Sequence, residues 1–356
     1  MAIVIAILVF CFIILLHEFG HFIAAKICGI YVKEFAFGMG PAIFKKRGKE
    51  TLYSIRAFPI GGFCSFDEDE GGDSNEIEID KNPRAFNRRP IWQRMIVILS
   101  GPLMNLILGY IVVVLSLCTS PAMASTTIAD FREQSVSNQS LMSGDEILKI
   151  DGMTIFSVSD ISYKLQNSDR KNEDGNLVFD FTVRRNGEKI KIPDVEFMTM
   201  ENQNGTSGVY FDFMVYRLDK NFGNVITEGF RESCSTARII IMSLVDMLRG
   251  KYGLNDLSGP IGFGSVITEA VKQYTFSDFM NIVSLITINV GVFNLLPIPA
   301  LDGARFVFMV IELIRRKPVK PEVEGMVHFV GFAALMILMI IVTFNDISKL
   351  VSGGMF

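Results

Sequence analysis

The stretch IVIAILVFCFIILLHEFGHFIAAKI, Ile3–Ile27, decides the fold of this chain. A helix needs about 20 apolar residues to cross a bilayer, and this run has that length. It has neither the basic start nor the small-residue cleavage site of a signal peptide. We therefore predict a retained transmembrane helix over residues 1–28.

Polar residues interrupt that run in the segment His-Glu-Phe-Gly-His, which places His17, Glu18 and His21 near one end of the predicted helix. Positions i and i+4 share a helix face, so both imidazoles can reach one ion. Zinc accepts imidazole nitrogen, and a glutamate beside it can take a proton from water. A chance match is the alternative. It is disfavoured because ionisable groups inside a membrane helix are costly without a partner.

Three further apolar runs predict three more spans. The second covers residues 92–118 and the fourth covers 326–350. The third covers 275–316, but its apolar part, Phe279–Leu296, carries Asn289 and Asn294 and leads into LLPIPALDG. Helices broken by proline and carrying a carboxylate at membrane depth line cavities and do not face lipid.

The basic loops predict the orientation of these spans. Lys and Arg gather after the first span, before the second, and between the third and fourth: Lys45, Lys46, Arg47, Lys49, Arg88, Arg89, Arg94, Arg315, Arg316, Lys317 and Lys320. The positive-inside rule places these loops in the cytoplasm. The termini and the segment between the second and third spans then face outward.

Composition agrees with a membrane protein and excludes other classes. Hydrophobic residues make up 49% of the 356, and the net charge of -4 provides no basic footprint for nucleic acid. The five cysteines have no CxxC spacing, which excludes a cysteine zinc ribbon and a disulfide scaffold.

Two segments outside the spans have mixed polarity. Residues 125–218 show strand-like alternation and contain GDEILKIDG, Gly144–Gly152, followed by a predicted helix at Ser159–Gln166. Residues 219–274 contain Thr236–Leu248, which is apolar on one face and predicts an interfacial helix.

A third metal ligand must come from elsewhere at similar depth, and Asp302 in NLLPIPALDG is the best candidate. Pro297 and Pro299 break the helix, and Gly303 lets the backbone turn, so Asp302 can point into the bundle. The alternative is that Asp302 caps the following helix. His328, at the start of the last span, is expected to be an interfacial or satisfied residue.

Residues 29–91 contain short predicted strands at Glu34–Gly38, Ala42–Lys46 and Thr51–Ala57, followed by an acidic loop at Asp67–Asp80. Such a hairpin can offer an open edge on which an unwound substrate adds a strand, or it can be an ordinary cytoplasmic hairpin. Asn289 and Asn294 can likewise hold a substrate backbone or serve as packing contacts between helices.

The chain resembles the site-2 protease family of intramembrane zinc metalloproteases, in the branch of bacterial regulators that cleave anti-sigma factors. HEFGH and the NLLPIPALDG segment carry the resemblance. FAFGMGP at Phe35–Pro41, GGF at Gly61–Phe63, SGPLMN at Ser100–Asn105 and SGPIGF at Ser258–Phe263 extend it over nearly the whole chain.

The resemblance implies that His17, His21 and Asp302 bind Zn²⁺ and that Glu18 is the catalytic acid/base. It implies substrate binding by Gly61, Gly62 and Phe63 together with Asn289 and Asn294, and it favours a membrane-re-entrant hairpin on the cytoplasmic side. It also implies a single PDZ domain at residues 125–218. The expected fold is thus a polytopic α-helical membrane protein with about four transmembrane helices and an extracytoplasmic α+β domain.

The expected activity is hydrolysis of peptide bonds within transmembrane segments of single-pass proteins, in the lipid bilayer of the bacterial cell membrane. Anti-sigma factors already cut by an upstream site-1-type protease, or remnant signal peptides, are the implied substrates. A non-catalytic PDZ adaptor is an alternative, and the intact HEFGH motif argues against it. A transporter is another, but one broken helix forms no inverted repeat.

Overall fold

The computed structural model describes residues 2–66, 82–168, 170–173, 175–201, 207–209, 211–251 and 275–351. The acidic run Asp67–Asp80 and the SGPIGF motif lie outside these residues. The chain divides into two compact units, which are described separately: Met1–Val112 with Leu244–Phe356, and Val113–Ser243.

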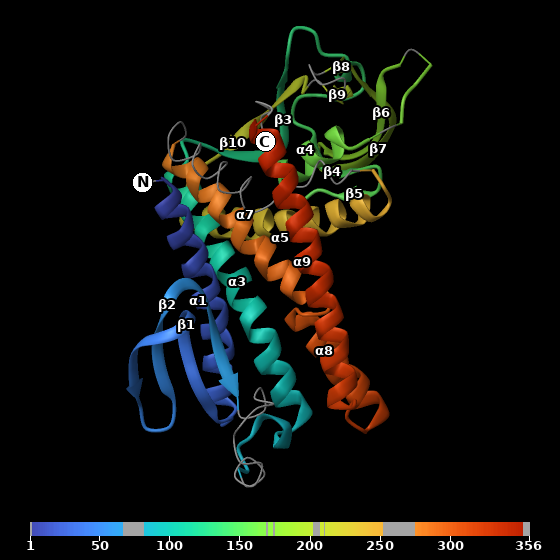
Figure 1. Cartoon of the computed structure of the whole chain (residues 1–356). Coiled ribbons are helices and arrows are strands. Elements are labelled where there is room, and N and C mark those ends of the chain that lie inside the picture. The colour runs from blue at the N-terminus through green and yellow to red at the C-terminus, as the bar shows by residue number, and fades with distance from the viewer. Residues whose placement is uncertain are drawn as a thin grey trace. The chain divides into compact units, whose positions relative to one another are not determined.

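Helices dominate the first unit (Figure 1). They are α1 (Ala2–Ile27), α3 (Ile91–Thr119), which continues into the second unit, α7 (Phe276–Leu295), α8 (Asp302–Arg315) and α9 (Pro321–Val351), with a 3-10 turn at Phe86–Arg88. Among the described residues, four helices are long and apolar enough to cross a membrane, namely α1, α3, α7 and α9. This agrees with the four spans predicted from the sequence.

The third predicted span, residues 275–316, forms two helices that are separated at the predicted proline break. α7 ends at Leu295, and α8 begins at Asp302. The residue before a proline is driven into extended conformation, and Leu296, which precedes Pro297, has a ψ of 148°. The break therefore follows from the proline pair of the LLPIPALDG segment.

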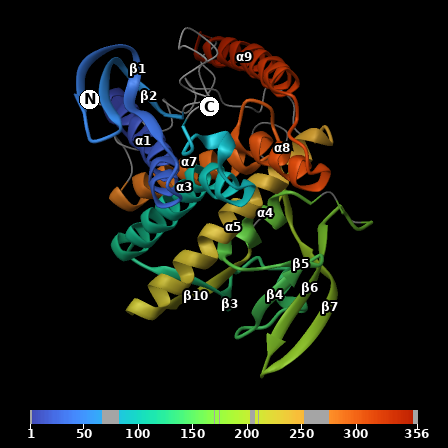
Figure 2. The ribbon, with the colours of Figure 1, turned by 90° about the horizontal axis from the view of Figure 1, so that it is seen from below.

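Small residues let α1, α3 and α7 pack closely, and Figure 2 shows the three helices side by side. A Cβ on Gly20 of α1 would lie 2.4 Å from the Ser100 carbonyl oxygen of α3, and one on Gly109 would lie 2.4 Å from Ile288 of α7. Lipid tails are as apolar as the side chains, so burying those side chains does not drive helices together in a membrane. Van der Waals packing does, and close approach of the backbones favours it.

Two long strands, β1 (Val32–Arg47) and β2 (Leu52–Phe66), follow α1. The three short strands predicted from the sequence are therefore parts of a longer hairpin. β1 bends at Gly38 and Gly40, where φ is positive. Its residues 34–37 pair with both 52–55 and 62–65 of β2, whereas residues 42–47 pair with 52–56 alone. Residues 62–65 thus form an edge of this sheet.

A cluster of ion pairs fastens the hairpin to the end of α1. Glu50 Oε1 accepts from Lys26 Nζ at 2.5 Å, and Glu50 Oε2 accepts from Arg84 Nη1 at 2.7 Å. Lys26 also donates to Thr51 Oγ1, which donates to the Val32 carbonyl oxygen. The hydrogen bonds from Arg84 and Lys26 lower the pKa of the Glu50 carboxyl to about 2.

We expect acid to loosen this attachment. Because the pKa of Glu50 is lower in the folded chain than in the unfolded one, its stabilising contribution is complete above about pH 4.5 and is lost as the pH falls toward 2. Hydrogen exchange of the hairpin amides should increase over that window. Glu50→Gln should exchange faster already at pH 7 and lose this component of the pH dependence. An unchanged profile in Glu50→Gln would contradict the assignment.

The second unit is built on an antiparallel sheet in the order β10-β3-β4-β6-β7, with β5 paired to β4. Its strands are β3 (Met123–Phe131), β4 (Glu146–Ile150), β5 (Met153–Thr154), β6 (Leu177–Arg185), β7 (Glu188–Phe197) and β10 (Phe213–Leu218). The short strands β8 (Thr199–Glu201) and β9 (Ser207–Val209) pair with each other. The helices are α4 (Val158–Gln166), α5 (Phe222–Leu248) and a 3-10 turn at Ser137–Gln139.

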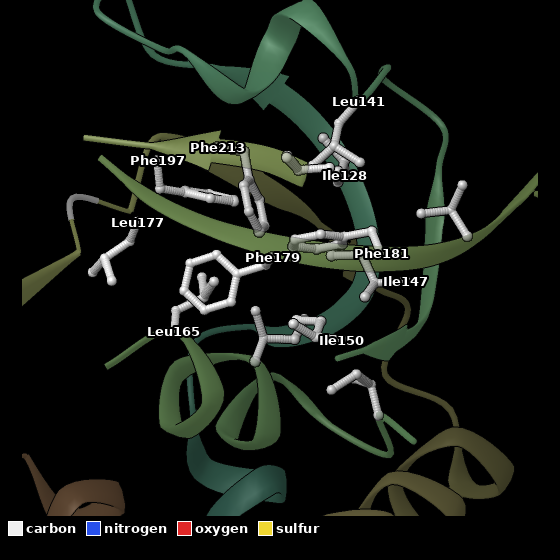
Figure 3. Packing of buried hydrophobic residues seen from close by; sticks show 14 residues of the cluster. Ile128, Leu141, Ile147, Ile150, Leu165, Leu177, Phe179, Phe181, Phe197 and Phe213 are labelled. Carbon is white, nitrogen blue, oxygen red and sulfur yellow. The ribbon is translucent and has the colours of Figure 1, made fainter. Parts of the chain in front are cut away.

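Aromatic side chains fill the core between this sheet and α4 (Figure 3). Phe179 of β6 is fully buried and meets Phe197 of β7 edge to face, with ring centroids 5.5 Å apart. Leu165 of α4 lies against the same cluster. The predicted alternation along β6 is incomplete, because Val178 and Thr182 on its other face are also buried. The other face of this strand is therefore partly covered, while Asp180 and Arg184 on it remain exposed.

α5 begins at Phe222, fourteen residues before the interfacial helix expected at Thr236–Leu248. The added turns carry polar contacts to α4. Ser235 Oγ donates to the buried Asp160 carboxylate at 2.6 Å, and Ser159 donates to Glu232 at 2.5 Å. These turns carry polar residues whose partners lie on α4, so they lack the apolar periodicity by which a helix is predicted from sequence.

Phe179→Ala should lower the unfolding free energy of the second unit by about 3–5 kcal/mol, because it opens a cavity in a fully packed core. Met142→Ala, at a side chain that is 56% exposed, is the control and should change the unfolding free energy by less than about 0.5 kcal/mol. Denaturant titration followed by limited proteolysis measures both. Equal losses in the two variants would contradict this description of the core.

Candidate metal centre

The two histidines of HEFGH lie on one face of α1, one turn apart. His17 is 8% exposed and His21 6% exposed, and their Nε2 atoms are 3.2 Å apart. This is the arrangement that the i, i+4 spacing predicts. Both rings therefore direct a nitrogen toward one point inside the helical bundle.

The loop between α7 and α8 brings Asp302 to the same point. Ala300 has a φ of 76°, a left-handed conformation that is rare outside glycine. A Cβ on Gly303 would lie 2.1 Å from the Leu296 carbonyl oxygen, so only glycine allows α8 to start so close to the end of α7. Asp302 Oδ2 then lies 2.9 Å from His17 Nε2 and 3.2 Å from His21 Nε2. Leu301, not Asp302, occupies the N-cap position of α8.

Hydrogen bonds on the far side of each ring decide which nitrogen faces that point. His21 Nδ1 donates to the Val97 carbonyl oxygen at 2.8 Å, which leaves Nε2 with a lone pair. The amide of Asn105 lies 3.3 Å from His17 Nδ1, is fully buried, and has an unpartnered Oδ1. Turning that amide by 180° lets Oδ1 accept from His17 Nδ1–H. Metal-binding imidazoles are held in this way by a carbonyl or carboxyl oxygen.

These three atoms fit a zinc ion. Two imidazole lone pairs and a carboxylate oxygen that face one another repel unless a cation lies between them. Tetrahedral ligands at 2.0–2.1 Å from zinc are about 3.3 Å apart, close to the observed 2.9–3.2 Å. Within the described residues, His17, His21 and Asp302 bring their ligand atoms within 4.8 Å of one another. Gly101 of α3 makes room for them, since a Cβ there would lie 2.3 Å from His21 Nε2.

Glu18 lies beside this cluster and is held by the hairpin. Its Oε2 accepts from the Cys64 backbone N–H of β2 at 3.0 Å. A Cβ on Gly62 would lie 3.6 Å from Glu18 Cγ and only 2.8 Å from the Ala36 carbonyl oxygen. A cavity of about 510 Å³ opens here, lined by these residues: His17, Glu18, His21, Phe63, Cys64, Phe66, Ile98, Ala300, Asp302, Arg305, His328, Phe329 and Phe332.

The remaining predicted site residues do not all line the cavity. Phe63 lines the cavity, whereas Gly61 and Gly62 precede it in β2. Asn289 is half-buried on α7, and the Asn294 amide donates to the Val290 carbonyl oxygen of its own helix at 2.9 Å. Neither asparagine is among the described residues that line the cavity.

Sequence reasoning missed two side chains at this site. Asn105 is the first, although an amide within an apolar span already indicates a polar partner. His328, expected to be an interfacial or satisfied residue, accepts a hydrogen bond from Ala300 and also lines the cavity. The partner of Asn105 lies on α1 and that of His328 in the loop between α7 and α8, so local spacing could not reveal them.

Comparison with known proteins identifies the family of this chain. The sequence model of Peptidase family M50 matches residues 5–338. The chain belongs to peptidase family M50. The predicted resemblance to the site-2 proteases is thereby confirmed.

The M50 chain is similar over its full length to several bacterial proteins. A protein of Clostridium acetobutylicum named as a zinc metalloprotease is 35% identical over 350 residues, with 97% of each chain covered. Zinc metalloprotease RasP of Geobacillus kaustophilus is 30% identical, with 96% of this chain and 97% of the relative covered. Regulator of sigma-W protease RasP of Bacillus subtilis is 27% identical, with 97% of each covered. The M50 protein is therefore a zinc metalloprotease with several membrane helices, and its cofactor is Zn²⁺.

Asn105→Ala should weaken zinc binding by this M50 protease about 10- to 100-fold, because His17 loses the group that orients its ring. Asn105→Asp should retain most of the affinity, since a carboxylate oxygen can accept from His17 Nδ1–H. Competition with a chelator, followed by metal analysis, measures the affinity of both variants. Wild-type affinity in Asn105→Ala would exclude this role.

Proposed function

We propose that this protease hydrolyses peptide bonds of transmembrane segments within the bilayer, with zinc held by His17, His21 and Asp302 and with Glu18 as the catalytic acid/base. One observation carries the proposal. His17 and His21 lie inside the apolar span Val4–Ile27, and at 1.5 Å per residue they are about 15 and 9 Å from its end at Ile27. Substrate bonds must therefore reach membrane depth to be cut.

The residues around the cavity have separable roles in this chemistry. A bound zinc ion supplies Lewis acidity toward a carbonyl and lowers the pKa of water. Glu18 Oε2 is already bonded to Cys64 N–H, so Oε1 remains to take the proton from water and deliver it to the leaving amine. The hydrogen bond from β2 keeps the carboxylate turned toward the imidazoles.

The hairpin offers a way to hold an unwound substrate. A helical peptide engages its carbonyls in its own hydrogen bonds, so it must extend before water can attack. Residues 62–65 of β2 form a sheet edge, and Phe63, Cys64 and Phe66 line the cavity. A substrate strand added beside Gly61, Gly62 and Phe63 would pass close to Glu18. Asn289 and Asn294 are proposed as further substrate contacts along α7.

We extend the proposal to topology. Basic loops support a position of the re-entrant β1–β2 hairpin and of the 3-10 turn Phe86–Arg88 on the cytoplasmic side, with the metal site near that side of the bacterial cell membrane. Residues 125–218 are proposed as an extracytoplasmic PDZ domain, supported by an antiparallel sheet that packs with α4 around one aromatic core. Such a domain can bind a peptide or exclude untrimmed substrates.

The proposed substrates are single-pass membrane proteins. The name of the Bacillus subtilis relative, regulator of sigma-W protease, supports anti-sigma factors that a site-1-type protease has already shortened outside the membrane. Remnant signal peptides present the same chemistry, namely one apolar helix without a large outer domain. A non-catalytic adaptor has no need for the complete set of Glu18 and three metal ligands.

Glu18→Gln should reduce cleavage of a tagged single-span substrate by about 10²–10⁴-fold while zinc remains bound, because the amide cannot take the proton but leaves the ligands in place. Cleavage in proteoliposomes and metal analysis of the same preparation measure the two effects. Glu322→Gln, at an exposed carboxylate that starts α9, is the matched control and should cleave normally. Persistent cleavage by Glu18→Gln would sink the assignment.

A further inference from the structure

α9 contacts the loop between α7 and α8 through His328 and Gly331, although most of the helix is exposed. Only 6% of its apolar window is buried, against 33–44% for the other three candidate spans. Its Gly331 lies against the loop between α7 and α8, where a Cβ would be 2.1 Å from Pro299 Cβ. One turn earlier, His328 Nδ1 accepts from the Ala300 backbone N–H at 3.0 Å. The contact is therefore both tight and polar.

The hydrogen bond to Ala300 fixes the state of the imidazole. Since Nδ1 accepts a hydrogen bond, the neutral ring carries its own proton on Nε2. His328 Nε2 is buried and has no hydrogen-bond partner in the part of the chain that the structure describes, and the nearest Glu324 oxygen is 3.9 Å away. The hydrogen bond from Ala300 is thus the one that this partly buried ring makes among those residues.

Ala300 is the residue whose conformation needs support. Its φ of 76° is unfavourable for a residue with a Cβ, and such conformations persist only where surrounding contacts hold them. Asp302 follows two residues later and begins α8. The direction of its carboxylate depends on this turn, because Gly303, the next residue, already lies close to the Leu296 carbonyl oxygen.

From these contacts we propose that His328 is a positioning residue for the metal centre. By accepting the Ala300 N–H it holds the left-handed turn that directs the Asp302 carboxylate at His17 and His21. The inference rests on the proposed role of Asp302 as a zinc ligand. It assigns α9 a part in the metal site that neither the HEFGH motif nor the LLPIPALDG segment contains.

The test compares two replacements of one ring. In His328→Asn, the amide oxygen takes the place of Nδ1 and can still accept from Ala300. In His328→Phe, the ring keeps its bulk but has no acceptor. We expect His328→Phe to weaken zinc binding by the full-length protein in detergent about 10- to 100-fold, as loss of an orienting partner does at metal sites, and His328→Asn to restore most of it. Val330→Phe, at a position that is 61% exposed on α9, controls for added bulk.

Zinc affinity is read by chelator competition without substrate, so the result does not depend on whether the tagged helix is cleaved. Cleavage rates of the same proteins should fall in the order wild type, His328→Asn, His328→Phe. Wild-type zinc affinity in His328→Phe would overturn the proposal, as would a loss in His328→Asn equal to that in His328→Phe. If the wild type bound zinc but did not cut, the proposed function would fail while the role of His328 stood.

Discussion

Three electron-pair donors meet at one point inside an apolar helical bundle, and the remaining structure serves to hold them there. His17 Nε2, His21 Nε2 and Asp302 Oδ2 lie within 3.2 Å of one another. In a medium without water such a cluster is unfavourable unless a cation neutralises it. Zinc binding and the packing of the helices are therefore coupled, and each depends on the other.

Glycine supplies the space that this cluster requires. Gly101 lets the α3 backbone lie against an imidazole, and Gly303 lets α8 start against the end of α7. Where a glycine is absent, as at Ala300, the strained backbone donates a hydrogen bond to a neighbouring helix. The positions of the three ligand side chains thus depend on close contacts between backbones.

The hairpin links the proposed substrate-binding edge to Glu18, the proposed acid/base. The same strand that presents the open edge at residues 62–65 donates the Cys64 N–H to Glu18. Its attachment to the end of α1 through Lys26, Glu50 and Arg84 fixes that edge relative to the HEFGH motif. A shift of the hairpin would therefore change the position of the carboxylate together with that of the edge.

The sequence alone determined the four apolar spans, the face shared by His17 and His21, and Asp302 as the candidate third ligand, because these follow from helix length, the 3.6-residue period and the proline break. Tertiary structure decided the length and bend of the hairpin and the partners Asn105 and His328. A local pattern shows which face of an element is polar. It does not show which residues contact that face, because those contacts depend on which distant segments can approach closely enough to form a hydrogen bond.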